Sequence, residues 1–253
     1  MLAVKYLSKQ FEGLVAVKEL NFDIQEGEIL AIIGPNGAGK STVFNLLTGT
    51  LKPTAGKVFI HDEDITGLKP YQIVKKGVAR TFQTTSLFDQ LRVIDNMLIG
   101  CKWRTRLGFW NTLFHTPGWK SQHDQAVQSA LETLDFLGLA DKALAFIPTL
   151  SQEEQKRLAI GVALVSKPKL LLLDEPTGGL IREETERIAQ FIKSVREQGT
   201  TVCIIEHKMQ MIMGMADRIL VLNYGQKIAE GSPDDIKSNQ AVIEAYLGGE
   251  AHA

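Results

Sequence analysis

The fold of this chain is decided by a short glycine-rich stretch, Gly34-Pro35-Asn36-Gly37-Ala38-Gly39-Lys40-Ser41-Thr42. The stretch fits the pattern G-x-x-x-x-G-K-[ST] at every fixed position. Glycines let such a backbone curl so that successive N–H groups point at phosphate oxygens. In this pattern Lys40 reaches the β- and γ-phosphates and the Ser41 hydroxyl ligates Mg²⁺. We therefore predict a phosphate-binding loop rather than an ordinary glycine-rich turn.

The residues on either side of the loop fit this interpretation. Residues 29–33 are all apolar and predict a buried strand, whereas residues 41–48 predict a helix. The N-terminus of that helix adds a positive dipole end for the phosphates. The sequence thus predicts an α/β fold with a nucleotide site between a strand and a helix.

The composition is that of an ordinary globular protein. The 253 residues are 44% hydrophobic and 23% charged, with a formal net charge of -1, so we expect no nucleic-acid partner, which usually requires a basic excess. The two cysteines, Cys101 and Cys203, lack metal-binding spacing and fit a reducing compartment. No run of about 18 apolar residues occurs, and residues 1–11 do not resemble a signal peptide, so we expect membrane association only through a partner.

The residue pattern changes character along the chain. Up to about Gly27 it alternates and predicts antiparallel strands, whereas residues 87–164 show helical spacing and predict a mostly helical lobe. Leu170–Asp174 then predicts a fully buried, parallel strand. The remaining elements that we expect are a helix at 182–198, a strand at 201–205, a hairpin at 218–222 and 226–230, and a closing helix from Ser232 to about Gly248.

Two acids directly follow the four-leucine strand. Asp174 is placed to hold Mg²⁺, directly or through water, beside the phosphate loop. Glu175 is then placed to act as the general base that polarises an attacking water. The alternative interpretation is a strand followed by an acidic turn.

Three further side chains are candidates on their position alone. His207 follows the strand at 201–205 and could contact the γ-phosphate and orient the water, or it could be structural. Gln83 follows a predicted strand and precedes the helical lobe, where its amide could touch both Mg²⁺ and the water. Phe11 could stack on adenine or could be an ordinary core residue.

The order of these features resembles that of the ATP-binding cassette (ABC) ATPases over essentially the whole chain. The resemblance implies that Phe11 stacks on the adenine, that residues 34–42 form the Walker A loop, with Asn36, Gly37, Ala38, Gly39, Lys40, Ser41 and Thr42 binding ATP, and that Gln83 is the Q-loop glutamine. It also implies that Asp174 and Glu175 are the Walker B aspartate and the catalytic glutamate, and that His207 is the switch histidine. Ser41, Gln83 and Asp174 would then hold Mg²⁺.

The resemblance implies a P-loop NTPase of the ABC fold. Such a chain has a RecA-like core, an N-terminal antiparallel β-subdomain and a helical subdomain, here at about residues 87–165, within a single ATPase domain of residues 1–253. Residues 11–17, 80–88, 102–120 and 241–248 are similar to the longer ATP-binding subunit of branched-chain amino acid importers. Related importers carry urea, amides or other amino acids, and a soluble cassette protein of translation or repair remains an alternative.

An importer subunit implies several partners. These are a second, non-identical cassette, transmembrane permease subunits and, indirectly, a periplasmic or extracellular solute-binding protein. The chain would then lie at the cytoplasmic face of the membrane as a peripheral subunit, with ATP and Mg²⁺ as its ligands.

One motif departs from the family pattern Leu-Ser-Gly-Gly-Gln. Here the segment keeps Ser151, but Gln152 and Glu153 replace the two glycines. In dimers this motif closes over the ATP of the partner. A carboxylate about 5 Å from a phosphate charge costs roughly 3 kcal/mol at an effective dielectric of about 20. Either the site completed for the partner is weakened, which would also fit a weakly hydrolysing regulatory cassette, or Glu153 turns into solvent.

Overall fold

The computed structural model of the chain describes residues 1–81, 87–101 and 117–247. The chain falls into two compact units, one of residues 1–80 with 169–253 and the other of residues 81–168. The first unit contains two β-sheets, and the second is helical. The helical unit spans the predicted 87–165 stretch and extends a few residues beyond both of its ends. That the two units work as one ATPase domain stays a prediction.

A mainly parallel sheet forms the centre of the first unit, in the order β10-β9-β3-β8-β7-β6. Its strands are β3 (Ile29–Ile33), β6 (Val78–Arg80), β7 (Leu170–Asp174), β8 (Thr201–Ile205), β9 (Arg218–Asn223) and β10 (Gln226–Gly231). Only β10 runs antiparallel to its neighbour. Every residue of β3, β7 and β8 is buried, as their continuous apolar runs predict. The carboxyl ends of β3, β7 and β8 therefore meet at one edge of the sheet.

The second sheet is antiparallel, in the order β2-β1-β4-β5. Its strands are β1 (Leu2–Phe11), β2 (Leu14–Ile24), β4 (Ala55–Ile60) and β5 (Glu63–Asp64). β1 and β2 are longer than the strands that the sequence predicts, at about residues 3–7 and 19–24, and they are joined by Glu12-Gly13. Both turn residues have positive φ (41° and 99°), which matches the twist of a tight hairpin.

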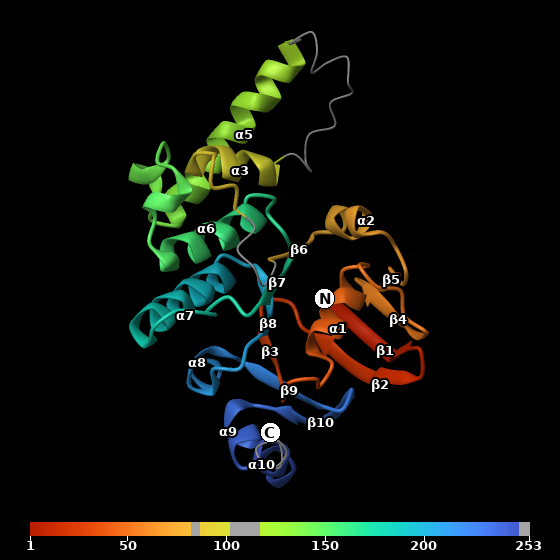
Figure 1. The fold of residues 1–253 in the computed structure, drawn as a ribbon. Coiled ribbons are helices and arrows are strands. Elements are labelled where there is room, and N and C mark those ends of the chain that lie inside the picture. The colour runs from red at the N-terminus through yellow and green to blue at the C-terminus, as the bar shows by residue number, and fades with distance from the viewer. Residues whose placement is uncertain (82–86, 102–116, 248–253) are drawn as a thin grey trace. The chain divides into compact units, whose positions relative to one another are not determined.

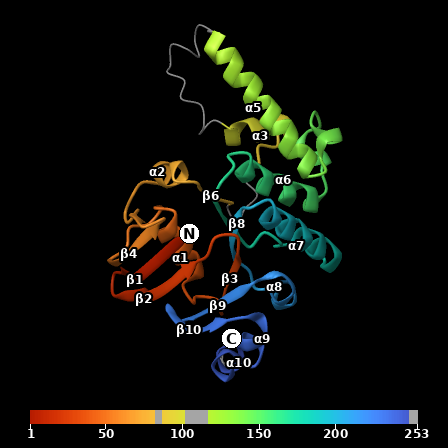
Figure 2. The ribbon, with the colours of Figure 1, turned by 180° about the vertical axis from the view of Figure 1, so that it is seen from behind.

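Within the described part of the first unit, six helices accompany the sheets. They are α1 (Lys40–Leu47), α2 (Pro70–Lys75), α7 (Arg182–Glu197), α8 (Met209–Met215), α9 (Pro233–Lys237) and α10 (Gln240–Leu247). Phe44 of α1 is fully buried in a core cluster that draws residues from both sheets. In two opposite views, α7 and α8 lie on the other side of the parallel sheet from α1 (Figures 1 and 2). The helix that follows the phosphate loop is thus fixed between two sheets.

The predicted closing helix is wrong in one respect, because the structure has two helices where we expected one. Ser232 caps α9 as predicted, with its hydroxyl accepting from the Asp235 amide at 3.3 Å. The helical conformation is then interrupted at Asn239, whose side-chain oxygen accepts from the Val242 amide at 3.3 Å. A second capping residue therefore starts α10, since asparagine competes with the helix for backbone partners.

The helical unit contains α3 (Val93–Cys101), α5 (Pro117–Phe136), α6 (Gln152–Leu164) and the short 3₁₀ helices η2 (Ala140–Lys142) and η3 (Ile147–Thr149). Helical spacing in residues 125–137 predicts an apolar stripe, of which Ala130, Leu134 and Leu137 are buried but Leu131 is exposed. A Cβ on Gly100 would overlap the Val162 carbonyl oxygen. This glycine therefore lets α3 approach α6 closely, which no apolar pattern predicts.

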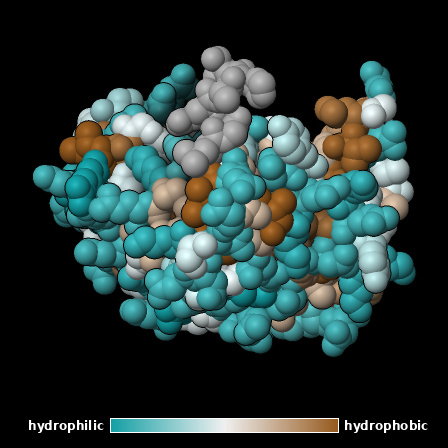
Figure 3. Space-filling view, turned by 90° about the horizontal axis from the view of Figure 1, so that it is seen from below, coloured by the Kyte–Doolittle hydropathy of each residue, from teal (hydrophilic) through white to brown (hydrophobic). Residues whose placement is uncertain are grey.

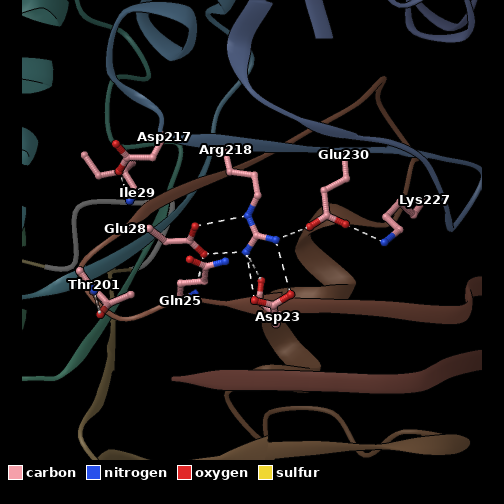
Figure 4. Close-up of polar contacts among 10 residues, drawn as sticks. Asp23, Gln25, Glu28, Ile29, Thr201, Asp217, Arg218, Lys227 and Glu230 are labelled. Carbon is pink, nitrogen blue, oxygen red and sulfur yellow. Dashed lines mark hydrogen bonds and ion pairs between the residues drawn. The ribbon is translucent and has the colours of Figure 1, made fainter. Parts of the chain in front are cut away.

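A cluster of charged residues joins the start of β9, the segment before β3 and the carboxyl-terminal ends of β2 and β10 (Figure 4). The Arg218 guanidinium lies 2.8 Å from Glu28 Oε1 and 2.5 Å from Glu230 Oε1, and it donates to the Asp23 carbonyl at 2.7 Å. Burial alone would lower the pKa of Arg218, but the Glu28 and Asp23 carboxylates outweigh it and raise that pKa. The cluster ties β9 to β10 and to the segment before β3.

The face of the first unit that carries the C-terminal helices is largely hydrophilic, with small separate apolar patches (Figure 3). Among the residues that the structure describes, no helix is both long and apolar enough to cross a bilayer.

Candidate functional site

The phosphate loop connects β3 to α1 at the carboxyl edge of the parallel sheet. Its glycines Gly34, Gly37 and Gly39 have φ of 151°, 80° and 98°, values that other residues rarely adopt. A Cβ on Gly34 would overlap the Leu222 carbonyl oxygen, and one on Gly39 would crowd that of Ala16. Glycine is thus required at both positions by packing as well as by backbone conformation.

The loop is braced from outside by the turn between β9 and β10. The Gly225 amide donates to the Ala38 carbonyl at 3.1 Å, and the Gly225 carbonyl accepts from the Lys18 amide at 2.9 Å. The Ala38 amide in turn donates to the Pro35 carbonyl at 3.2 Å. The loop is therefore held in a curled form by parts of the chain that are far away in sequence.

Lys40 extends back under the loop. Its side chain is 9% exposed, and its ammonium donates to the Gly34 and Pro35 carbonyls at 2.7 and 2.9 Å. Burial lowers the pKa of Lys40, while the charges of Glu175 and Asp174 oppose that shift. Ser41 and Thr42 follow in the first turn of α1, where Ser41 is exposed.

The structure brings the predicted acids and histidine to the same edge. Asp174 ends β7 and Glu175 directly follows it. Asp174 pairs with Ile205, the last residue of β8, so His207 lies just beyond the end of the neighbouring strand. His207 Nδ1 lies 4.0 Å from Glu175 Oε1. Glu175 has φ of 46°, an uncommon value for a residue with a side chain. The strain at this position marks a backbone that its surroundings hold in place.

The buried carboxylate of Glu206 links this histidine to the loop after Glu175. Glu206 is fully buried and accepts from the Thr177 amide at 3.1 Å, from the Thr177 hydroxyl and from the His207 amide at 2.9 Å. Sequence reasoning missed this residue. The signal was a charged residue that directly continues a buried apolar strand, because such a charge needs buried partners.

Lys208 holds the same loop from the other side of His207. Its ammonium donates to the Thr177 and Leu180 carbonyls at 3.0 and 2.9 Å, and to the Thr185 hydroxyl at 2.9 Å. All three donors of the ammonium are used. The residues before and after the histidine therefore clamp the segment that follows the catalytic candidate Glu175.

Arg80, at the end of β6, was also missed as a site residue. Its guanidinium lies 2.6 Å from Asp174 Oδ2, and the two side chains are 12% and 3% exposed. Asp174 Oδ1 is buried and has no hydrogen-bond partner among the described residues. A free carboxylate oxygen of this kind fits a Mg²⁺ site that is completed by nucleotide phosphates.

Phe11 and Gln83 are the other two side chains predicted to contact the nucleotide or its cation. Phe11 ends β1, is 40% exposed, and carries the Lys9 ammonium 4.9 Å from its ring centroid. Its ring is therefore accessible rather than buried in the core. Gln83 lies outside the described residues.

In the helical unit, Ser151 caps α6 and forms a capping box with Glu154. The Glu154 amide donates to the Ser151 hydroxyl at 3.2 Å, and the Ser151 amide donates to the Glu154 carboxylate at 2.9 Å. Burial would raise the pKa of Glu154, but the hydrogen bonds from Lys142 and from the Ser151 backbone outweigh it and hold that pKa below its ordinary value.

Glu153 does not turn into solvent, so that alternative is wrong. Its side chain is buried within the helical unit, where both carboxylate oxygens meet Arg157, at 2.5 and 2.6 Å from the same guanidinium nitrogen. Arg157 also donates to the Leu137 carbonyl at 2.9 Å. The charge at the second glycine position is thus balanced within its own helix, whereas Gln152 beside it is exposed.

Comparison with known proteins assigns the chain to a family. Residues 17–178 match the ABC transporter family, and residues 226–252 match a family described as "Branched-chain amino acid ATP-binding cassette transporter". The chain belongs to the ABC transporter family and is an ABC-type ATPase. The family assignment confirms the cassette fold and the ATP hydrolysis that the sequence predicts.

Individual relatives extend over nearly the whole chain. It is 40% identical over 249 residues to the high-affinity branched-chain amino acid transport ATP-binding protein LivG of Escherichia coli (strain K12), with 98% of both chains covered. It is 39% identical, with the same coverage, to BraF, a protein of the same description from Pseudomonas aeruginosa. A crystal structure of an ABC transporter cassette in its ADP conformation superposes with a TM-score of 0.87 at 32% identity, covering 98% of each chain.

Proposed function

We propose that this chain is the ATP-hydrolysing subunit of a branched-chain amino acid importer, bound to permease subunits at the cytoplasmic face of the membrane. The similarity to LivG and BraF over 98% of each chain is the observation that carries the proposal. The family match at residues 226–252 supports the same substrate class at the C-terminus. Related importers of urea, amides or other amino acids remain the alternative for the solute.

The geometry supports hydrolysis of ATP by water. The loop amides and Lys40 bind the phosphates, and Phe11 offers an accessible ring to the adenine. Glu175 accepts a proton from the water as its oxygen attacks the γ-phosphorus, and His207 beside it orients that water. The bond from the γ-phosphorus to the bridging oxygen breaks, which leaves ADP and phosphate.

Asp174 and Ser41 are the described residues that would hold Mg²⁺, with Gln83 as a further proposed ligand. The cation would neutralise charge on the phosphate oxygens. The described residues contain no group of three or more carboxylate, histidine or cysteine side chains that could hold a metal alone. A site with one carboxylate and one hydroxyl, completed by phosphates, agrees with that finding.

A glutamate substitution tests the catalytic assignment. In the assembled transporter, Glu175→Gln should bind ATP as the wild type does but turn over about 100-fold more slowly or worse, the range for loss of a general base. Glu197→Gln, which changes an exposed glutamate at the end of α7, is the matched control and should leave turnover unchanged. Near-wild-type turnover of Glu175→Gln would contradict the assignment.

Competition of leucine, urea and amides for uptake into proteoliposomes then tests which solute the transporter carries.

We further propose that the partner cassette is a different chain. Gln152 and Glu153 add side chains where the family motif has glycines, and two copies of this chain would place them at both nucleotide sites. The Arg157 ion pair removes much of the charge repulsion expected for Glu153, so the argument now rests on the exposed Gln152 side chain, which replaces the first glycine of the motif. ATPase activity should be low for the purified chain and rise strongly on mixing with a second cassette from the same transporter. Strong cooperative hydrolysis by this chain alone would refute the heterodimer.

A further inference from the structure

Arg80 lies at the place where β6 meets the carboxyl edge of the parallel sheet. It pairs in register with Leu172 of β7, two residues before Asp174. One limb of its guanidinium, Nη2, lies 2.6 Å from Asp174 Oδ2. An arginine of the strand next to β7 thus holds the carboxylate that the ATPase site needs for its cation.

The other limb of the guanidinium is anchored on α1, the helix that follows the phosphate loop. Nη1 donates to Asn45 Oδ1 at 2.7 Å and contacts the Thr48 hydroxyl at 3.4 Å. The guanidinium carbon lies 5.6 Å from the centroid of the Phe44 ring. Because the fork is fixed in two directions and against a ring, it is a stable part of the site rather than a side chain that swings away.

This anchoring decides how Asp174 presents its two oxygens. The carboxylate is 3% exposed, and Oδ2 is occupied by Arg80, whereas Oδ1 is buried without a hydrogen-bond partner among the described residues. A charge-assisted hydrogen bond fixes direction as well as distance. The orientation of Asp174 is therefore set by a residue that links it to the helix bearing Ser41.

We propose that Arg80 is a positioning residue for the Mg²⁺–nucleotide site, where it fixes Asp174 so that Oδ1 is presented to the cation. The proposal rests on the ATPase function of the chain and adds a residue that acts through Asp174. Groups that orient metal-ligating carboxylates typically change metal affinity by about 10- to 100-fold when they are removed.

A lysine at this position separates positioning from simple charge balance. Arg80→Lys keeps the positive charge, but a single ammonium on a flexible stem cannot reproduce the two-limbed fork between Asn45 and Asp174. If the orientation of Asp174 matters, Arg80→Lys and Arg80→Met should both weaken Mg²⁺ binding at the nucleotide site. If only charge matters, the lysine should restore it.

The experiment measures binding of a fluorescent ADP analogue at increasing Mg²⁺ and, separately, in EDTA. For Arg80→Met and Arg80→Lys, the Mg²⁺ concentration for half-maximal enhancement should rise about 10-fold or more, while affinity in EDTA stays close to that of the wild type. The Mg²⁺ dependence of ATPase activity should shift by the same factor. Asn45→Ala, which removes only the anchor on α1, should shift it in the same direction and decides the matter if the arginine variants do not fold.

Arg218→Met is the matched control, because it removes a largely buried arginine from the opposite edge of the same sheet. It should lower stability without changing the Mg²⁺ dependence. An unchanged Mg²⁺ dependence in the Arg80 variants, tighter Mg²⁺ binding, or full rescue by lysine would overturn the proposal. A wild-type chain that binds no nucleotide would instead overturn the ATPase assignment, and the role of Arg80 with it.

Discussion

Replacing Arg157 should destabilise the helical unit strongly, because it leaves a buried charge without a partner. The Glu153 side chain is 5% exposed and that of Arg157 is 22% exposed. Breaking a buried ion pair on one side costs about 3–5 kcal/mol, and we expect Arg157→Met to lie in this range. At about 2–4 °C for each kcal/mol, the melting temperature should fall by about 6–20 °C.

Differential scanning calorimetry of the purified chain measures this effect. The double variant Glu153→Gln/Arg157→Met removes the stranded charge and should recover most of the loss. Arg182→Met is the control, since its pair with Glu186 has the same i,i+4 spacing but is 73% and 60% exposed, and it should change stability by at most about 0.5 kcal/mol. Equal melting temperatures for the Arg157 and Arg182 variants would refute the argument that Glu153 depends on its arginine.

Three further predictions follow from charged or buried groups. The lowered pKa of Glu154 means that its charged form stabilises the fold at neutral pH and that this stabilisation is lost as the pH falls below about 4; the melting temperature of Glu154→Gln should therefore fall less than that of the wild type between about pH 6 and about pH 3. Burial, followed by the charge of Glu28, raises the pKa of Cys203, so this thiol should not react with iodoacetamide at about pH 8 until the chain is unfolded, which mass spectrometry of the alkylated peptides would reveal. Arg218→Met removes the guanidinium that Asp23, Glu28 and Glu230 share, although Lys227 still pairs with Glu230, and it should lower the free energy of unfolding in urea by about 3 kcal/mol or more, whereas a change below about 0.5 kcal/mol would show that the cluster is not needed.

Local patterns were sufficient to predict the elements that build the nucleotide site. Residues 29–33 and 170–174 are continuous apolar runs, and a buried parallel strand is the structure that such short runs favour. The functional residues follow the carboxyl ends of these two strands and of the strand at 201–205, so the parallel sheet brings Lys40, Glu175 and His207 to one edge. The sequence predicted this edge because strand direction and residue order were enough to define it.

Contacts between distant segments could not be predicted in the same way. Arg80 meets Asp174 only because β6 pairs with β7, and a local pattern contains no information on that pairing. The burial of Glu153 could not be predicted either, although its partner Arg157 is only four residues away. Its spacing from Arg157 allows an ion pair, but burial of that pair depends on how α6 packs within the helical unit. The positions of side chains were thus predictable where sequence neighbours define them, and unpredictable where tertiary packing does.

The contact of Gly225 with the phosphate loop has a consequence for nucleotide affinity. Fixing the backbone of one residue costs about 1–2 kcal/mol, so a loose loop of this length would oppose binding by several kcal/mol. Here the turn between β9 and β10 holds Ala38, and Leu222 packs against Gly34, so the loop is ordered when the protein folds. ATP then binds to a preorganised loop, and none of its binding free energy is needed to order the chain. The strength of nucleotide binding is therefore set in part by a hairpin that lies far along the sequence from the loop.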